Sequence, residues 1–285
     1  MQNNLMEKIS VVIPCFNSGK TINRTISSVH AQTWKNIDII IVNDGSTDSY
    51  TKKILKEFKN VQIINQPNKG LPSARNTGIK KSNGNFLLFL DADDWIEKNA
   101  IEIMFKSLKK NNSDYVFCNT NLEGDKSGEQ KKYYNFFEQL FLNHVPYFIL
   151  IKKEVIKKVG LYDENMTSGY EDWELNLRLG KEGYFPNKVE QSLFHYNVSN
   201  SGMLNSISKR KHATIVKYIK KKHKNLFTLI NIIKIYIRWR RRKKNYNLII
   251  YIVLYIINFV FPNFFINKLF YLLHKSKVRL FNKKK

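Results

Sequence analysis

Short runs of β-branched and aliphatic residues alternate with helix-like repeats over the first 120 residues of the chain. Apolar runs of about four to eight residues are typical of buried strands, whereas apolar positions three and four residues apart are typical of helices. The pattern predicts strands at residues 9–14, 37–43, 61–65, 86–90 and 115–118. Between them it predicts a helix that carries Ile22, Ile26 and Val29 behind Ser18, a second behind Asp48, and a third over 71–81.

This alternation predicts an α/β fold with a mostly parallel, Rossmann-like sheet that helices cover on both faces. Further along the chain, residues 145–151 and 194–198 resemble strands, and residues 170–182 resemble an amphipathic helix. The polar residues 121–132 favour a mobile loop. Ligands of such sheets bind in the loops that follow the carboxyl ends of the strands, so we expect the functional site there.

Charge is divided unevenly along the 285 residues, which carry 48 Lys and Arg against 23 Asp and Glu, a net charge of +25. Residues 206–285 hold 22 of these basic side chains and no acidic one, so the first 205 residues are close to neutral. At 43% hydrophobic residues, the chain is too apolar for a disordered polycation. We therefore predict a globular domain at 1–205 and a basic, α-helical extension at 206–285.

The two cysteines, Cys15 and Cys118, lie far apart in apolar runs and form no paired spacing for a disulfide framework. The first ten residues, MQNNLMEKIS, lack the apolar stretch of a secretory signal peptide. Both features favour a reducing, cytoplasmic environment for the domain.

The basic extension also contains long apolar stretches. Residues 248–261 are apolar except for Asn258 and are followed by Pro262. A helix of that length spans about 21 Å, which is less than the roughly 30 Å hydrocarbon core of a bilayer. Whether residues 248–273 lie on the membrane or cross it stays open, although an interfacial segment fits better.

Basic residues beside apolar helices are attracted to the anionic inner leaflet. We therefore expect a peripheral or monotopic protein at the cytoplasmic face of the inner (plasma) membrane, and no nucleic-acid partner. The aromatic anchors at the interface would be Trp239, Tyr246, Tyr251 and Tyr255. Two alternatives remain: a tail that binds nucleic acid, and helices at 206–224 that pack on the first domain. The sequence carries no signal of the oligomeric state.

The polar residues with the clearest chemistry follow the apolar run at 86–90. Asp91 and Asp93 are one residue apart on a predicted turn, where two carboxylates can face one Mg²⁺ or Mn²⁺ ion. The alternative is an acidic cap, led by Asp93 or Asp94, for the helix that contains Ile101. A phosphate-binding P-loop is excluded because Pro14 stands where its first glycine is required, and no GxGxxG of a dinucleotide fold follows the first strand.

Six segments occur in the order VVIPCFNSG, IIVNDGSTDS, NKGLPSARNTGI, FLLFLDADD, GYEDWELNLRL and FHYNVSNSGM. Together they closely resemble the family 2 glycosyltransferases over about residues 8–203. The resemblance implies a glycosyltransferase A fold, with residues 1–205 as the catalytic domain. It also implies a nucleotide-diphospho-sugar donor, a divalent metal ion (Mn²⁺ or Mg²⁺) and inversion at the anomeric carbon.

The resemblance further assigns roles to single residues. Asp44 would accept a hydrogen bond from the uracil imide, and Arg75 would neutralise phosphate charge, although a surface ion pair is its alternative. Asp91 would contact the ribose or a metal-bound water. The nucleotide-sugar contacts implied in this way are Pro14, Phe16, Asn17, Asp44, Lys69, Gly70, Arg75, Asp91 and Ala92.

For the metal ion, the resemblance implies Asp93 as direct ligand, with Asp91 beside it and His195 as a further ligand; a packed strand residue is the alternative for His195. Glu171 and Asp172 resemble the catalytic acidic pair of the family, with Asp172 as general base. The alternative for this pair is favourable negative charge at a helix N-terminus. Asn197 stands where many relatives have Arg, which puts a diphosphate contact there in doubt.

The sequence thus predicts a membrane-associated, metal-dependent hexosyl- or N-acetylhexosaminyltransferase. It would move a sugar from a UDP-sugar to a hydroxyl of a growing, lipid-linked cell-surface glycan. One alternative is transfer to a polyprenyl phosphate, which is already anionic and needs no general base such as Asp172. The other is a non-catalytic module that binds membrane or nucleic acid, against which the complete set of Asp44, Asp91, Asp93 and Asp172 argues.

Overall fold

A computed structural model describes residues 7–199, 202–208, 210–244, 247–249 and 251–252 of the chain. The strands are β1 (Ile9–Cys15), β2 (Ile37–Asp44), β3 (Gln62–Gln66), β4 (Phe86–Phe89), β5 (Trp95–Ile96), β6 (Tyr115–Gly124), β7 (Gly128–Gln130), β8 (Leu150–Lys152) and β9 (Pro186–Val198). The helices are α1 (Ile22–His30), α2 (Ser49–Glu57), α3 (Leu71–Lys81), α4 (Ala100–Lys110), α5 (Phe136–Gln139), α6 (Lys153–Val159), α7 (Glu171–Lys181), α8 (His212–Lys222) and α9 (Leu229–Trp239). The described strands form one sheet in the order β3-β2-β1-β4-β8-β6-β9-β5, with β7 beside β6.

The first half of the sheet is parallel, as the sequence predicts. Strand β1 pairs in parallel with β2 and β4, and β2 pairs in parallel with β3. The helix predicted behind Asp48 is confirmed, because the Asp48 side chain accepts a hydrogen bond from the Thr51 amide at 2.7 Å and caps α2. The predicted helix at 71–81 coincides with α3.

The second half of the sheet is mixed, so the predicted parallel pairing applies to β1 to β4 and to β6 with β9. Strand β8 lies antiparallel between β4 and β6, whereas β6 and β9 are parallel. The mobile loop expected at 121–132 is instead a hairpin of β6 and β7, since the polar side chains project outward while the backbone pairs with β7 and β9. The strand expected at 145–151 begins only at Leu150, because the apolar residues before it fill the core without pairing.

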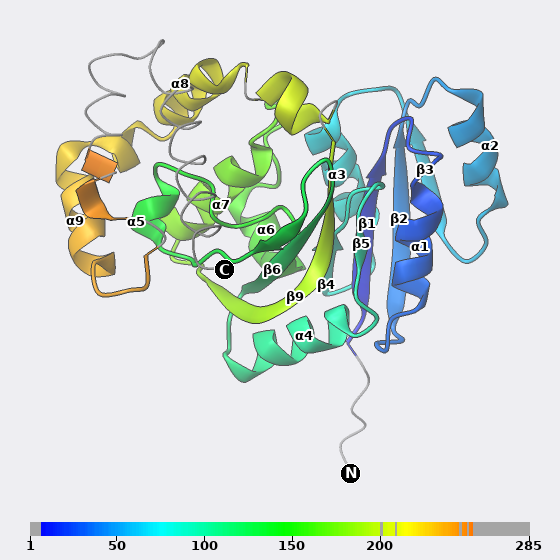
Figure 1. Ribbon diagram of the computed structural model, residues 1–285, viewed down its shortest axis with the longest axis horizontal. Helices are drawn as coiled ribbons and strands as arrows, with labels where there is room; N and C mark the ends of the chain where they lie inside the picture. The colour runs from blue at the N-terminus through cyan, green and yellow to red at the C-terminus, as the bar shows by residue number, and fades with distance from the viewer. Residues whose placement is uncertain (1–6, 200–201, 209, 245–246, 250, 253–285) are drawn as a thin grey trace.

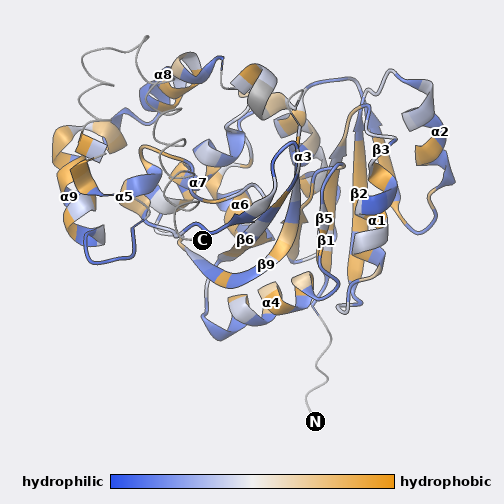
Figure 2. Ribbon diagram, in the orientation of Figure 1, coloured by the Kyte–Doolittle hydropathy of each residue, from blue (hydrophilic) through white to orange (hydrophobic). Residues whose placement is uncertain are grey.

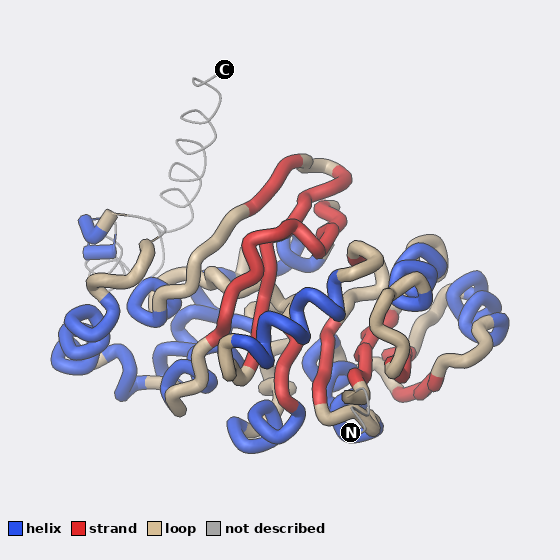
Figure 3. The backbone as a smooth tube through the Cα atoms, turned by 90° about the horizontal axis from the view of Figure 1, so that it is seen from below, coloured by secondary structure: helices blue, strands red, loops and turns tan. Residues whose placement is uncertain are grey.

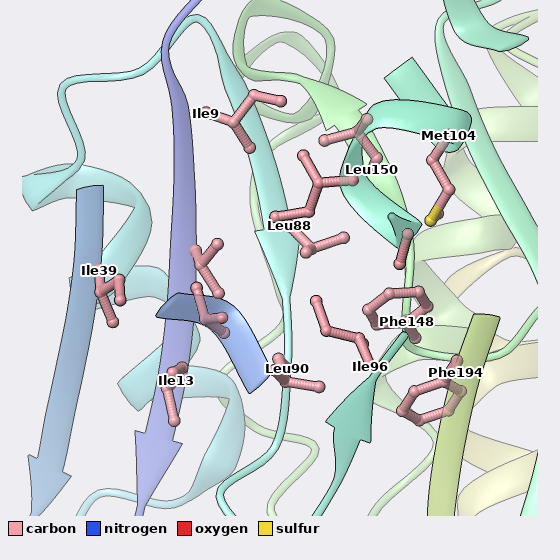
Figure 4. Close-up of a cluster of buried hydrophobic side chains, with 14 of the residues drawn as sticks. Ile9, Ile13, Ile39, Leu88, Leu90, Ile96, Met104, Phe148, Leu150 and Phe194 are labelled. Atoms are coloured by element: carbon pink, nitrogen blue, oxygen red, sulfur yellow. The ribbon is translucent and has the colours of Figure 1, made fainter. Parts of the chain in front are cut away.

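Helices cover both faces of the sheet (Figure 1 and Figure 3), and each face has its own core. Helices α1, α2 and α4 pack on one face, where Ile13, Leu88, Ile96 and Phe148 are among the buried side chains (Figure 4). Helices α3, α6 and α7 pack on the other face. Gly78 lets α3 lie close to β1, since a Cβ atom there would stand 2.3 Å from Val12 Cγ1. This packing fixes the strand ends that carry the candidate site.

The described part of the extension packs on helices of the first 205 residues. Helices α8 and α9 share a core with α5 and α7, which we call the C-terminal core: Phe136, Phe137, Leu140, Phe141, Met166, Trp173, Leu177, Ile215, Val216, Ile219, Leu226, Ile232, Trp239 and Tyr251. This favours the alternative in which residues 206–224 pack on the first domain. The boundary at residue 205 stays a prediction.

Trp239 and Tyr251 are buried in the C-terminal core, with 8% and 1% of their surface exposed. Their predicted role as membrane anchors is therefore wrong. The other two predicted anchors, Tyr246 and Tyr255, lie outside the described residues, as do residues 253–273 of the predicted membrane segment. Across the described residues, no helix combines the length and apolar character needed to cross a membrane.

Polar contacts reinforce the attachment of α8 to α7. Glu174 of α7 is fully buried and accepts hydrogen bonds from Arg178, one turn later, with its closest contact at 2.8 Å. His223 Nε2 and Lys222 Nζ, at the end of α8, each lie 2.8 Å from Glu174 Oε1. Three side chains that can be positively charged therefore surround one buried carboxylate, and two of them come from the extension.

Candidate active site

The loops after β1 and β2 are held together by one side chain. Asn17, whose φ of 52° is left-handed, accepts hydrogen bonds through Oδ1 from the amides of Thr47 at 2.8 Å and Asp48 at 3.2 Å. The backbone N–H of Asn17 donates a hydrogen bond to Ser46 Oγ at 3.0 Å. The Asn17 side chain thus shapes the predicted nucleoside pocket by fixing its two loops.

Pro14 and Phe16, which precede Asn17 in the chain, differ in their exposure. Pro14 is buried within β1, where its ring is part of the sheet rather than of an open surface. Phe16 leaves 45% of its surface exposed at the strand end. Of the two predicted nucleoside contacts, Phe16 is thus the one with a ring free to stack on a base.

Asp44, at the end of β2, clamps the stretch that leads into α3. Its Oδ1 accepts hydrogen bonds from Gln66 Nε2 at 2.7 Å and the Lys69 amide at 2.9 Å, and its Oδ2 accepts one from the Gly70 amide at 2.8 Å. Gly70 has a φ of 88°, which a residue with a Cβ atom adopts only with strain. Asp44 is 4% exposed and its carboxylate already accepts three hydrogen bonds, so a ligand N–H would use the second lone pair of Oδ2.

Arg75 of α3 lies inside the protein and links two of the predicted acidic groups. Its side chain is fully buried, with Nη2 at 2.8 Å from Asp91 Oδ1 and Nη1 at 2.5 Å from Glu171 Oε1. The guanidinium also lies over the rings of Tyr147 and Tyr162, at 4.9 and 5.4 Å from their centroids. This placement does not support the predicted phosphate contact, because the guanidinium faces other side chains.

The residues Asp91–Asp94, which we call the acidic turn, follow β4 and are held in place by Asp94, which is fully buried. Its carboxylate accepts hydrogen bonds from the Tyr147 hydroxyl and from the Asn197 amide, the latter at 2.7 Å. The same hydroxyl accepts a hydrogen bond from the Asp91 amide at 3.1 Å. The Tyr147 hydroxyl therefore bonds to both ends of the acidic turn, and its ring packs against the Arg75 guanidinium.

The acidic turn is not a helix cap. Helix α4 begins at Ala100, after the short strand β5, and Asn99 precedes it. The alternative in which Asp93 or Asp94 caps this helix is therefore wrong. Ala92 is buried in the turn, and its carbonyl accepts a hydrogen bond from Thr21 Oγ1 at 2.8 Å, so its contribution to a ligand site is to the shape of the backbone.

Asp91 and Asp93 form a negatively charged pair at the strand end. Burial and the neighbouring charge of Asp91 raise the pKa of Asp93 to about 6. Within the described ranges, no group of three or more His, Cys, Asp or Glu side chains is arranged as a metal site. Two carboxylates nevertheless fit Mg²⁺ or Mn²⁺, since Mg²⁺ is commonly held by one or two carboxylates together with substrate phosphates and water.

His195 lies between two glutamates. Its Nδ1 is 2.8 Å from Glu123 Oε1 and its Nε2 is 2.8 Å from Glu97 Oε1, while its ring stacks on Trp95 at a centroid distance of 3.5 Å. Both ring nitrogens are thus engaged, and a metal-ligand role would require His195 to leave one glutamate. The fit of the site to a metal ion therefore depends on Asp91 and Asp93.

The acidic pair at the start of α7 divides into an inward and an outward carboxylate. Glu171 is 4% exposed and points to Arg75, whereas Asp172 is half-buried. Asp172 accepts hydrogen bonds from the Trp173 amide and from Asn143 Nδ2, each at 2.8 Å. Burial raises the pKa of both carboxyl groups, against the charge of Arg75. Asp172 accepts a hydrogen bond from a first-turn amide, as the helix-charge alternative expects.

Among the site residues that were not predicted are Glu97, Glu123, Asn143 and Tyr147. Tyr147 and Asn143 belong to the irregular segment between α5 and β8, where no periodic pattern places side chains. Glu97 and Glu123 come from segments that only the pairing of β5 and β6 with β9 brings to His195. The one local signal that could have pointed to Tyr147 is that it carries the only side-chain hydroxyl group in the apolar run at 145–151.

Comparison with known proteins gives consistent results. The family model described as "Glycosyl transferase family 2" matches residues 10–167. The glycosyltransferase GlyA of Streptococcus pneumoniae is 39% identical over 117 residues, which cover 40% of this chain and 17% of GlyA. The poly(ribitol-phosphate) beta-N-acetylglucosaminyltransferase TarP of Staphylococcus aureus is 39% identical over 125 residues, which cover 42% of this chain and 38% of TarP. The chain therefore matches well under half the length of these curated relatives.

Among solved structures, S. aureus TarS 1-349 in complex with UDP-GlcNAc matches with a TM-score of 0.66 at 17% identity. The match covers 82% of this chain and 72% of that chain. At this identity the likeness concerns the fold. The arrangement of the mixed sheet and its flanking helices is therefore one that a sugar-nucleotide-binding protein also adopts.

Proposed function

The chain belongs to glycosyl transferase family 2 and has a glycosyltransferase A type of fold, and from this premise we propose that it transfers a sugar from a UDP-sugar to a hydroxyl group of a growing, lipid-linked cell-surface glycan. The acceptor would be presented at the cytoplasmic face of the plasma membrane. The sugar would be a hexose or an N-acetylhexosamine.

The observation that carries this proposal is the buried connection from the acidic turn to the start of α7. Arg75 pairs with Asp91 on one side and with Glu171 on the other. Asp172 is the next residue of α7, and the charge of Arg75 acts on its carboxyl group as well. One buried guanidinium thus joins the turn proposed to hold a cation to the helix start proposed to supply the general base, the two functions that transfer from a nucleotide-diphospho-sugar requires.

In the proposed reaction Asp172 is the general base. As its carboxylate takes the proton from the acceptor hydroxyl, the hydroxyl oxygen attacks the anomeric carbon on the side opposite the departing nucleoside diphosphate, which inverts that carbon. Hydrogen bonds from Asn143 and the Trp173 amide orient the carboxylate. Glu171 and Arg75 act as positioning residues. A Mn²⁺ or Mg²⁺ ion held by Asp91 and Asp93 would stabilise the charge of the leaving diphosphate.

The choice of a uridine nucleotide follows from Asp44. Its remaining Oδ2 lone pair suits one N–H donor, as the imide of uracil provides, while exposed Phe16 can stack on the ring. Two of the similar TarS structures are complexes with UDP and with UDP-GlcNAc. A hydroxyl acceptor is preferred to a polyprenyl phosphate because Asp172 would have no proton to remove from the latter.

The test is UDP release by the full chain with a panel of UDP-sugars and glycan acceptors, with Mn²⁺ or Mg²⁺ and with a chelator. We expect Asp172→Asn to lower kcat by about 10²- to 10⁴-fold at an unchanged donor KM. The matched control is Glu182→Gln, just beyond the end of the same helix, where the side chain is exposed. Full activity of Asp172→Asn, or undiminished activity in chelator, would contradict the mechanism. A phosphodiester in the product would contradict the hydroxyl acceptor.

A further inference from the structure

Helix α9 has an apolar face that points away from the protein. Leu229, Ile230, Ile233 and Ile237 leave between 47% and 66% of their surfaces exposed. Ile230, Ile233 and Ile237 follow one another at spacings of three and four, and Leu229 lies four residues before Ile233, so the four side chains share one side of the helix. We call this set the α9 stripe; Figure 2 shows the apolar character of α9 at the edge of the molecule.

The helix that carries the stripe is itself firmly attached. Its opposite side places Ile232 and Trp239 in the C-terminal core, each with 8% of its surface exposed. Asn135, buried before α5, donates a hydrogen bond through Nδ2 to the Trp239 carbonyl at 3.2 Å. The Thr228 hydroxyl caps the first turn. The stripe is therefore the outward-facing side of a helix whose inward-facing side packs in the C-terminal core.

Basic side chains accompany the stripe. Lys234 and Arg238 are exposed and lie one turn apart beside it, and the run at 240–242 adds three arginines at the helix end. On the far side of Lys234 and Arg238, a groove of about 210 Å³ opens between α9 and α7. It has apolar walls and a cationic rim: Phe136, Leu226, Phe185, Ile235 and Trp239 with Lys181, Lys234 and Arg238.

We propose that the α9 stripe and its basic flank bind the surface of an anionic lipid bilayer. The isoleucine side chains would enter the boundary between headgroups and acyl chains, and Lys234 and Arg238 would pair with lipid phosphates. Charge complementarity selects this partner, because the chain carries no acidic residue after Glu190 and the cations border aliphatic side chains. The contact involves the outer face of α9 and not the buried rings of Trp239 and Tyr251, and it is independent of the sugar-transfer reaction.

The experiment is co-sedimentation of the full chain with phosphatidylcholine vesicles that contain or lack phosphatidylglycerol, without any nucleotide sugar. We expect binding to the anionic vesicles, and a loss of about thirtyfold in partitioning for Lys234→Gln/Arg238→Gln. For Ile233→Asn/Ile237→Asn we expect a loss of about tenfold or more on the same vesicles. Because all four side chains are exposed, urea midpoints should match the unmodified protein.

The matched control is Lys52→Gln/Lys56→Gln on α2, at the opposite end of the molecule (Figure 1), which should bind like the unmodified protein. Equal binding of Ile233→Asn/Ile237→Asn and the unmodified protein would overturn the proposal and assign the membrane contact to residues beyond 252. Equal binding to both vesicle types would overturn the role of the basic flank. A dimer in analytical ultracentrifugation that Ile233→Asn/Ile237→Asn dissociates would identify the stripe as a contact between two copies.

Discussion

Replacing Glu174 by Gln is expected to lower the free energy of unfolding by about 3 kcal/mol at neutral pH. The substitution keeps the size of the side chain, removes its charge and replaces one acceptor oxygen by an NH₂ group. It places an amide NH₂ against Arg178, Lys222 and His223, which at present donate to the carboxylate. The loss therefore reports the stability of the whole cluster, in which Lys222 and His223 belong to the extension and Arg178 to α7.

The magnitude follows from the acidity of the buried carboxyl group. Burial alone would raise the pKa of Glu174, but hydrogen bonds from His223 and Arg178 and the charge of Arg178 lower it from 4.5 to about 2. A difference of about two and a half pKa units corresponds to about 3 kcal/mol. Because the folded-state pKa is the lower one, this stability is complete above about pH 4.5 and is lost as the pH falls towards 2.

The assay is urea unfolding followed by circular dichroism at pH 7 and pH 3. The control is Glu182→Gln, whose side chain is 56% exposed and whose loss should stay within about 0.5 kcal/mol. At pH 3 the difference between Glu174→Gln and the unmodified protein should fall to less than half of its value at pH 7. A loss no larger than that of the control, or one independent of pH, would refute the reasoning.

Three further outcomes are expected. Tyr147→Phe should lower kcat about tenfold or more, because the buried carboxylate of Asp94 loses its hydroxyl donor and the acidic turn loosens; steady-state kinetics with a urea midpoint as control measures this. The acid limb of the kcat profile should lie above the range of an ordinary aspartate, since burial raises the pKa of Asp172 and only its ionised form accepts a proton; the limb should vanish in Asp172→Asn. Gly78→Ala should cost about 1–3 kcal/mol in urea unfolding, because the new Cβ meets Val12, and a neutral result would mean that α3 can move away from β1.

Local signals in the sequence predicted the parallel half of the sheet and the strand-end location of the site. Asp44 and Asp91 directly follow apolar runs, so the rule that ligands bind at strand ends was enough to select them. For β1 to β4 the runs gave the strand limits to within one or two residues, whereas β6, β8 and β9 differ from their predicted limits by more. The Asp48 cap was predicted equally well, because capping involves only residues within one turn.

What the sequence could not supply were pairs of residues that only the tertiary fold brings together. Arg75 and Glu171 are 96 residues apart, and no local pattern indicates that one buried guanidinium joins them. His195 and Glu97 meet for a similar reason, across 98 residues. Trp239 and Tyr251 were predicted at a membrane because their apolar neighbours are compatible with either a bilayer or a core, and composition does not separate the two.

The double pairing of Arg75 also constrains how such a protein can change its specificity. Because the guanidinium joins the acidic turn to the first residue of α7, a segment exchanged from a relative that alters only one of these partners leaves the other carboxylate buried without its cation. The hairpin at 121–132 lies outside this connection. Recombination between relatives should therefore tolerate exchange of the hairpin far better than exchange of the acidic turn alone or of the start of α7 alone. An exchanged hairpin needs to keep Glu123, the partner of His195, whereas Arg75, Asp91 and Glu171 need to be exchanged together.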